Sequence, residues 1–230
     1  MATFQQLLDK YAFLAFEKQT RLSRLVGDHE WLPDVQSAKM VFNDQLQFSV
    51  QFLGTDSTRT NTWLWADANI DSSFPNKNLE LCGEARASGP RFSLPEFLAD
   101  KVDLIDEVGR PTGHTLPMVA TCFIEASCYY WAPHEHGAVY LMFVDSRIDN
   151  QPDFNLDEFS NAFNELMWIP GDMKARIISY FVSKGRIPSD FSGDKLTGRL
   201  NTGEKLDFAF RQNNEDGMEI IYSPEPTTDE

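Results

Sequence analysis

The first pattern along the chain is helical. Apolar residues recur every three or four positions over 4–25, a spacing that places them on one face of an α-helix. Thr3 and Gln6 fit a capping box at its start, and Gly27 fits its end. We expect this amphipathic helix to pack against the protein's own sheet, because its polar face is not basic enough for attachment to a membrane surface.

Strand patterns follow the helix. Apolar and polar residues alternate over 45–52, after a short apolar segment at 38–42 and a turn at 43–44. Alternation with period two is typical of a strand with one buried face. A polar loop then leads to 62–66, where Trp63 and Trp65 share one face. We expect these three strands to form an antiparallel meander.

The middle of the chain mixes helical and strand patterns. Four prolines interrupt 71–113, and a helical stretch is expected over 94–108. A buried helix is predicted over 116–128, leading directly into a strand at 129–131. The apolar run over 138–144 is typical of a central strand.

The last third of the chain repeats the order of helices followed by strands. Asn155 and Glu158 fit the cap of a helix, and a second helix is expected to end at Gly185. Alternation then returns in three short segments separated by turns. These segments are 195–200, 206–210 and 218–222.

These patterns together predict an α+β fold. We expect an antiparallel β-sheet meander packed with an N-terminal amphipathic helix and further helices, plus a C-terminal helix pair and β-hairpin extension. We divide the chain into an α+β domain over 1–150, a helical pair and β-meander extension packed on the same domain over 151–222, and a disordered acidic tail over 223–230.

The net charge of the chain narrows the choice of partners. The chain has 35 acidic and 20 basic residues, for a formal charge of −15. That balance argues against binding to a nucleic acid, whose phosphates are neutralised by Lys and Arg. No segment approaches the roughly 20 apolar residues that cross a bilayer, and the N-terminus does not resemble a signal peptide. We expect no membrane association and a cytoplasmic location.

The three cysteines do not form a recognisable motif. Cys82, Cys122 and Cys128 are odd in number and include no C-x-x-C pair, so neither a disulfide framework nor a zinc ribbon is indicated. We interpret them as reduced thiols that pack in the core.

Two stretches resemble a known family. Residues 63–69 read WLWADAN and follow Phe52-Leu53-Gly54, and residues 120–145 contain a small-residue helix, an aromatic strand, a proline turn and an apolar strand. Together they resemble an uncharacterised bacterial family, a domain of unknown function marked by the strand W-L-W-A-W-A-N. This chain has Asp67 in place of the third aromatic residue. The resemblance covers roughly 3–145 and implies a fold, but no catalytic residues.

The tryptophan motif is also a candidate ligand site. On a continuing strand, Trp63, Trp65, Asp67 and Asn69 lie on one side, where they would form an aromatic wall and a polar floor. The alternative is that the two indoles pack a helix against the sheet and that Asn69 holds a turn.

Metal and catalytic motifs are weak or missing. His134 and His136 flank Glu135 in a short turn and are weak candidates for metal ligands, because no third ligand lies nearby in the sequence. The sequence has no G-x-S-x-G, phosphate loop or dinucleotide fingerprint. We therefore predict no catalytic residue and no cofactor, which favours a protein that is not an enzyme.

Two functional hypotheses remain. The preferred one is a non-catalytic acidic protein that binds a basic protein partner, as an immunity or regulatory protein does, because opposite charges accelerate association. The alternative is a small-molecule-binding protein or enzyme that uses the Trp63/Trp65 face with Asp67 and Asn69.

Overall fold

The computed structural model describes residues 2–70, 74–105, 109, 111–186, 188, 194–212 and 218–225. Its helices are α1 (Phe4–Val26), α2 (Glu80–Phe92), α3 (Pro95–Leu98), α4 (Thr115–Phe123), α5 (Ser146–Asp149), α6 (Leu156–Met167) and α7 (Met173–Ser183), with 3-10 turns η1 (Ala66–Ala68) and η2 (Asn76–Asn78). Its strands are β1 (Trp31–Asp34), β2 (Lys39–Phe42), β3 (Leu46–Ser49), β4 (Gln51–Ser57), β5 (Thr62–Trp65), β6 (Lys101–Asp103), β7 (Cys128–His134), β8 (Gly137–Phe143), β9 (Lys195–Arg199), β10 (Lys205–Gln212) and β11 (Met218–Glu225).

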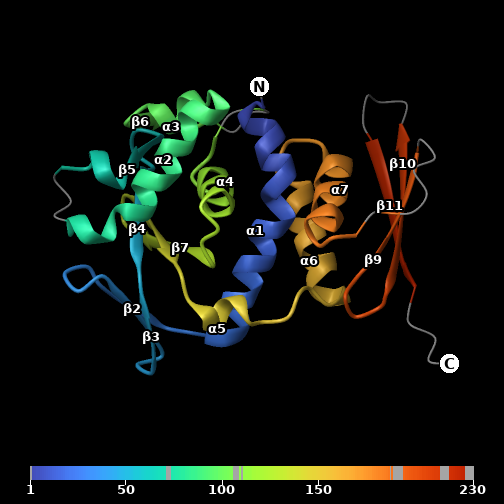
Figure 1. Cartoon of the computed structure of the whole chain (residues 1–230), viewed down its shortest axis with the longest axis horizontal. Coiled ribbons are helices and arrows are strands. Elements are labelled where there is room, and N and C mark those ends of the chain that lie inside the picture. The colour runs from blue at the N-terminus through green and yellow to red at the C-terminus, as the bar shows by residue number, and fades with distance from the viewer. Residues whose placement is uncertain are drawn as a thin grey trace.

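The strands form three antiparallel sheets, so the predicted α+β class with antiparallel sheets is confirmed. The largest sheet has the order β6-β5-β4-β8-β7, and the two smaller sheets have the orders β1-β2-β3 and β11-β10-β9. In Figure 1, α1 runs through the middle of the molecule. The five-stranded sheet lies on one side of α1 with α2, α3 and α4, and α6, α7 and the C-terminal sheet lie on the other side.

Helix α1 forms as its sequence predicts. The amide of Gln6 donates to the Thr3 hydroxyl over 3.2 Å, and the amide of Thr3 donates to Gln6 Oε1 over 2.9 Å. The helix ends at Gly27, whose φ of 60° suits glycine. The buried face of α1 contacts α4 and α7, which explains its central position.

The strand β5 carries the tryptophan motif into the core. Both indoles are fully buried, with 0 % of their surface exposed. Their rings meet edge to face at 5.5 Å, and Trp63 packs on Tyr140 at 4.9 Å while Trp65 packs on Phe97 at 5.1 Å. The motif therefore joins the central sheet to α3.

The predicted three-stranded meander is wrong in its connectivity. The alternating segment 45–52 breaks at Val50 into β3 and β4, which belong to different sheets. The Val50 amide donates to the Ala38 carbonyl over 3.0 Å, and its own carbonyl accepts from Asn78 Nδ2 over 3.1 Å. The chain changes sheets at this residue. Strand β1, which the sequence pattern did not predict, completes the sheet of β2 and β3.

Two predicted helices are shorter in the structure. The stretch 94–108 contains only the single turn α3 before β6 pairs with β5; 106–108 lie outside the described residues. The helix predicted over 116–128 ends at Phe123, because Glu125 adopts a left-handed conformation with a φ of 53°.

The C-terminal third contains the expected helix pair and three strands. The capping box of Asn155 and Glu158 is present at the start of α6. Strand β11 continues to Glu225, three residues into the predicted tail, while 226–230 and the turn at 216–217 lie outside the described residues. The division of the chain near residue 150 stays a prediction.

Buried contacts connect this C-terminal third to α1. Glu17 is a fully buried carboxylate on α1 that accepts from the Tyr180 hydroxyl over 2.6 Å and from Arg21 over 2.9 Å, and it also pairs with Lys184. Phe13 of α1 stacks on Phe159 of α6 at 5.0 Å. Within the described residues, no helix combines the length and the apolar composition needed to cross a bilayer.

Candidate functional site

A cavity of about 440 Å³ lies among α1, α4, β7 and the chain from the end of α6 into the loop before α7. We call it the α1–α4 cavity. Its apolar lining residues are Leu8, Phe16, Met118, Ile169 and Pro170. Its polar or amphipathic lining residues are Gln5, Thr112, His114, Thr115, Tyr129, Glu165 and Trp168.

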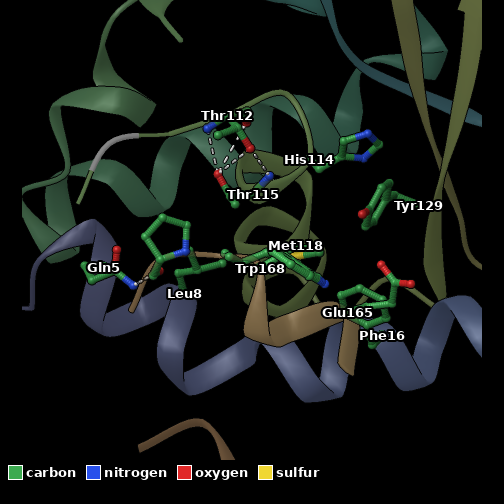
Figure 2. A pocket seen from close by; sticks show the side chains of 12 residues that line it. Gln5, Leu8, Phe16, Thr112, His114, Thr115, Met118, Tyr129, Glu165 and Trp168 are labelled. Atoms are coloured by element: carbon green, nitrogen blue, oxygen red, sulfur yellow. Dashed lines mark hydrogen bonds between the residues drawn. The ribbon is translucent and has the colours of Figure 1, made fainter. Parts of the chain in front are cut away.

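Four polar groups at this cavity, three of them on exposed side chains, make no hydrogen bond to the described chain. They are the imidazole of His114, the hydroxyl of Tyr129, the carboxylate of Glu165 and the indole N–H of Trp168. Figure 2 shows the Tyr129 hydroxyl and the Glu165 carboxylate turned toward the same part of the cavity, with the Trp168 indole between α1 and α4 in the view. By contrast, two hydroxyls at the start of α4 are paired. The Thr115 hydroxyl accepts from the amide of Thr112, and the Thr112 hydroxyl accepts from the amide of Thr115.

Tyr129 is the most informative of the four. Its side chain is only 5 % exposed, yet its hydroxyl makes no hydrogen bond to the described chain. The hydroxyl opens onto the cavity and is not sealed in the core as the unpaired Nε1 of Trp63 is. This hydroxyl is therefore suited to a partner that enters the cavity.

The environment sets the protonation of two of these groups. Partial desolvation of the imidazole lowers the pKa of His114 below its ordinary value, despite the opposing attraction of Asp56. The imidazole is then neutral at neutral pH, with one nitrogen that donates and one that accepts. Burial, with smaller effects of Cys128 and Cys122, raises the pKa of Tyr129 well above its ordinary range. Its hydroxyl therefore keeps its proton.

A tightly packed glycine positions His114. A Cβ at Gly113 would lie 2.5 Å from Asp56 Oδ2 and 2.6 Å from the Tyr140 hydroxyl. Those two atoms already form a hydrogen bond of 3.0 Å. The His114 ring meets Tyr140 edge-on at 5.9 Å and Trp131 at 5.4 Å. The close approach at Gly113 thus brings the imidazole to the edge of the cavity.

A buried ion pair positions Trp168. Arg176 is 1 % exposed, and its Nε donates to Asp9 Oδ1 of α1 over 2.8 Å. The rest of the guanidinium donates to three carbonyls around Trp168, those of Leu166 and Ile169 at 2.8 Å and Pro170 at 2.6 Å. Arg176 therefore fixes the end of α6 and the following loop against α1, while the indole itself stays 86 % exposed.

None of the four residues of the tryptophan motif that was predicted as a ligand face lines the α1–α4 cavity. Trp63 and Trp65 are fully buried, and the Trp65 indole donates to the Glu96 carbonyl over 3.0 Å. Asp67 accepts from Arg86 over 2.7 Å, and Asn69 follows η1. A ligand-binding role for these four residues stays a prediction.

The weak metal candidates lie in the turn between β7 and β8. His134 and His136 are exposed, and His136 Nε2 lies 3.8 Å from the carboxylate of the adjacent Glu135. In the part of the chain that the structure describes, no three His, Cys, Asp or Glu residues gather as a metal site would require.

The three cysteines are free and buried. Burial raises the pKa of Cys82 and of Cys122 to about 12 and that of Cys128 further. All three therefore remain protonated thiols at neutral pH, with the low reactivity that this implies.

Sequence reasoning did not identify His114, Tyr129, Glu165 or Trp168. They come from three distant segments, and none belongs to a motif with chemical meaning in the sequence. One local signal was present, because Trp168 stands at the end of a helix, two residues before Pro170-Gly171.

Comparison with known proteins gives a family but no function. Residues 5–146 match the model of DUF6882, a family of unknown function. No curated protein and no solved structure matches the chain. The matched range includes Tyr129 and His114 but ends before Glu165 and Trp168. The predicted resemblance to an uncharacterised family is confirmed, and the chain belongs to the DUF6882 family of unknown function.

Proposed function

We propose that this protein binds a small organic molecule in the α1–α4 cavity. The observation that carries the proposal is a cavity of about 440 Å³ at which four polar groups make no hydrogen bond to the described chain and are therefore available to a ligand. Polar groups that the protein does not use itself can fix the orientation of a bound molecule.

The size and composition of the cavity support this function. Ligand pockets usually enclose about 300–1,000 Å³ and combine apolar walls with a few placed polar groups. The α1–α4 cavity, at about 440 Å³, has Leu8 and Phe16 on one wall and Met118 on another. These side chains would contact the apolar body of the ligand, while the polar groups would orient it.

The polar groups are better suited to binding than to covalent chemistry. The lining residues include two hydroxyl side chains of Thr, and both are hydrogen-bonded at the start of α4. The three described thiols are buried and protonated. We therefore favour a binding protein, and we place it in the cytoplasm, where buried free thiols stay reduced.

A thermal-shift screen of small molecules on the wild type and three variants tests the proposal. Trp168→Ala and Tyr129→Phe remove the indole and the unpaired hydroxyl, whereas Met167→Ala alters an exposed neighbour that does not line the cavity. A compound at a hundredfold its Kd stabilises by about 2.7 kcal/mol. We expect hits on the wild type and on Met167→Ala that weaken on the other two variants. Hits that bind all four proteins equally would overturn the proposal.

A further inference from the structure

We propose that the ligand of the α1–α4 cavity carries a protonated amine, which lies between the Glu165 carboxylate and the Tyr129 hydroxyl and against the indole of Trp168. This inference rests on the proposed function, because it names the chemical class of the molecule that the cavity binds.

The charge of the cavity favours a cation. Of its twelve described lining residues, Glu165 is the only Asp, Glu, Lys or Arg, and its carboxylate makes no ion pair within the described chain. Arg176 lies behind the neighbouring loop, but its charge is matched by Asp9 at 2.8 Å. His114 is neutral because partial desolvation lowers its pKa. An anionic ligand would meet the unpaired carboxylate, whereas an ammonium group would neutralise it.

Aromatic side chains add to this preference. Trp168, Tyr129 and Phe16 all line the cavity, and aromatic faces attract cations, Trp most strongly. The attraction is worth about 0.5–1 kcal/mol at an exposed site and more where water is excluded. Trp168 is itself largely exposed, so its indole can close over a ligand without first leaving a packed position.

The hydrogen-bonding groups match a primary amine. An ammonium group has three donors and no acceptor. The Glu165 carboxylate, the oxygen of Tyr129 and the acceptor nitrogen of neutral His114 can each receive one of them. The Trp168 N–H is a donor, so we expect the ligand to offer an acceptor, such as a hydroxyl or carbonyl oxygen, near the mouth of the cavity.

The amine can belong to a free molecule or to a lysine side chain of a protein. The second source connects the cavity with the net charge of −15, because a basic partner would be attracted to the whole molecule and would present lysine side chains to Glu165. The chemistry at the site is the same in both cases.

Three probes of similar shape test the charge preference. They are 2-phenylethylamine, which is cationic at pH 7, neutral 2-phenylethanol and anionic phenylacetate. We expect the amine to bind at least tenfold more tightly than the alcohol and the acid to bind least, as measured by isothermal titration calorimetry. Equal binding of amine and alcohol, or preferred binding of the acid, would overturn the cation inference and leave the cavity as a small-molecule site. If none of the three binds, the inference is wrong, and the thermal-shift screen decides separately whether the proposed function survives.

Charge-matched variants identify the carboxylate. Glu165→Gln removes the charge at the cavity, and Asp157→Asn removes an equal charge from an exposed position at the other end of α6. We expect Glu165→Gln to weaken the amine about tenfold and to leave the alcohol unchanged, while Asp157→Asn changes neither. Equal effects of the two variants would show that the net charge of the protein, and not Glu165, selects the cation, and would overturn the assignment.

A lysine peptide then distinguishes the two sources of the amine. The blocked pentapeptide Ac-Gly-Gly-Lys-Gly-Gly-NH2 presents the side chain alone, and the same peptide with an acetylated lysine lacks its charge. Binding of the first peptide but not the second, with loss on Glu165→Gln, supports a protein partner. Binding of 2-phenylethylamine without either peptide supports a free amine. Binding of the acetylated peptide as tightly as the charged one would contradict the proposal.

Discussion

The molecule places tryptophan in two opposite settings. Trp63 and Trp65 lie on β5 in the middle of the core, fully buried and in contact with other aromatic rings. Trp168 lies at the end of α6, 86 % exposed, beside a cavity at which several polar groups make no hydrogen bond to the described chain. Trp63 and Trp65 are the most conspicuous feature of the sequence, whereas Trp168 belongs to no motif.

The difference lies in what surrounds each indole. Around β5, neighbouring rings and helices already fill the space; the Trp65 N–H donates to the Glu96 carbonyl, while the Trp63 Nε1 is buried without a hydrogen-bond partner in the described chain. Removing such side chains should unfold the protein. Around Trp168, the protein offers unsatisfied groups and open volume. Changes there should alter binding and leave the fold intact. Substitutions in the first region should therefore lower stability, and substitutions in the second should lower ligand affinity.

The largest effect is expected from Trp63→Ala. This substitution removes a fully buried indole that packs on Trp65 and Tyr140, and such truncations cost about 3–5 kcal/mol. Urea unfolding followed by circular dichroism measures the loss. A loss below about 1 kcal/mol would mean that this part of the core is not packed as described.

Arg176→Leu is expected to cost about 3 kcal/mol or more. It leaves Asp9 buried without its cation and removes the donors to the carbonyls of Leu166, Ile169 and Pro170; breaking a buried ion pair at one partner typically costs about 3–5 kcal/mol. Arg59→Leu, at an exposed arginine, is the matched control. If both variants unfold at the same urea concentration, the loop of Trp168 is not held by this ion pair.

Trp168→Ala is expected to change stability by no more than about 0.5 kcal/mol, as for other exposed positions. The same urea experiment checks it, and a cost like that of Trp63→Ala would contradict the contrast between the two regions. The cavity variant Tyr129→Phe should also be stable, because it removes a hydroxyl that faces the cavity and makes no hydrogen bond to the described chain.

The smallest effect is a pH dependence from His114. Its pKa in the folded protein is lowered by partial desolvation, so the unfolded chain binds the proton more tightly. Below about pH 6.5, protonation therefore favours unfolding, and the contribution saturates below the folded pKa. His114→Gln should lose stability less steeply than the wild type as the pH falls from 6.5. If the variant loses stability more steeply than the wild type, folding raises the pKa of His114 and the account is wrong.

The sequence predicts the local elements well where a pattern is long or capped. Helix α1, with its capping box and terminal glycine, follows from its residues alone. The sheet change at Val50 does not, because it depends on hydrogen bonds to Ala38 and Asn78, which come from other parts of the chain. Alternation reports which side of a strand is buried, but not which sheet the strand joins.

The cavity could not be predicted for a related reason. Tyr129 and His114 lie in the range that matches DUF6882, whereas Glu165 and Trp168 lie beyond it. Only the packing of α6 and α7 on α1, fixed by Arg176 and Asp9, brings the two sets together. No periodicity or local spacing contains that information.

The central claim is that ligands bind at Trp168 and not at the tryptophans of β5. Incorporation of ¹⁵N-indole tryptophan gives one N–H signal for each of the five tryptophans, assigned by single substitutions. On titration with 2-phenylethylamine, the Trp168 signal should move, while the signals of buried Trp63 and Trp65 stay in place. Movement of the Trp63 or Trp65 signal with an unchanged Trp168 signal would contradict the account.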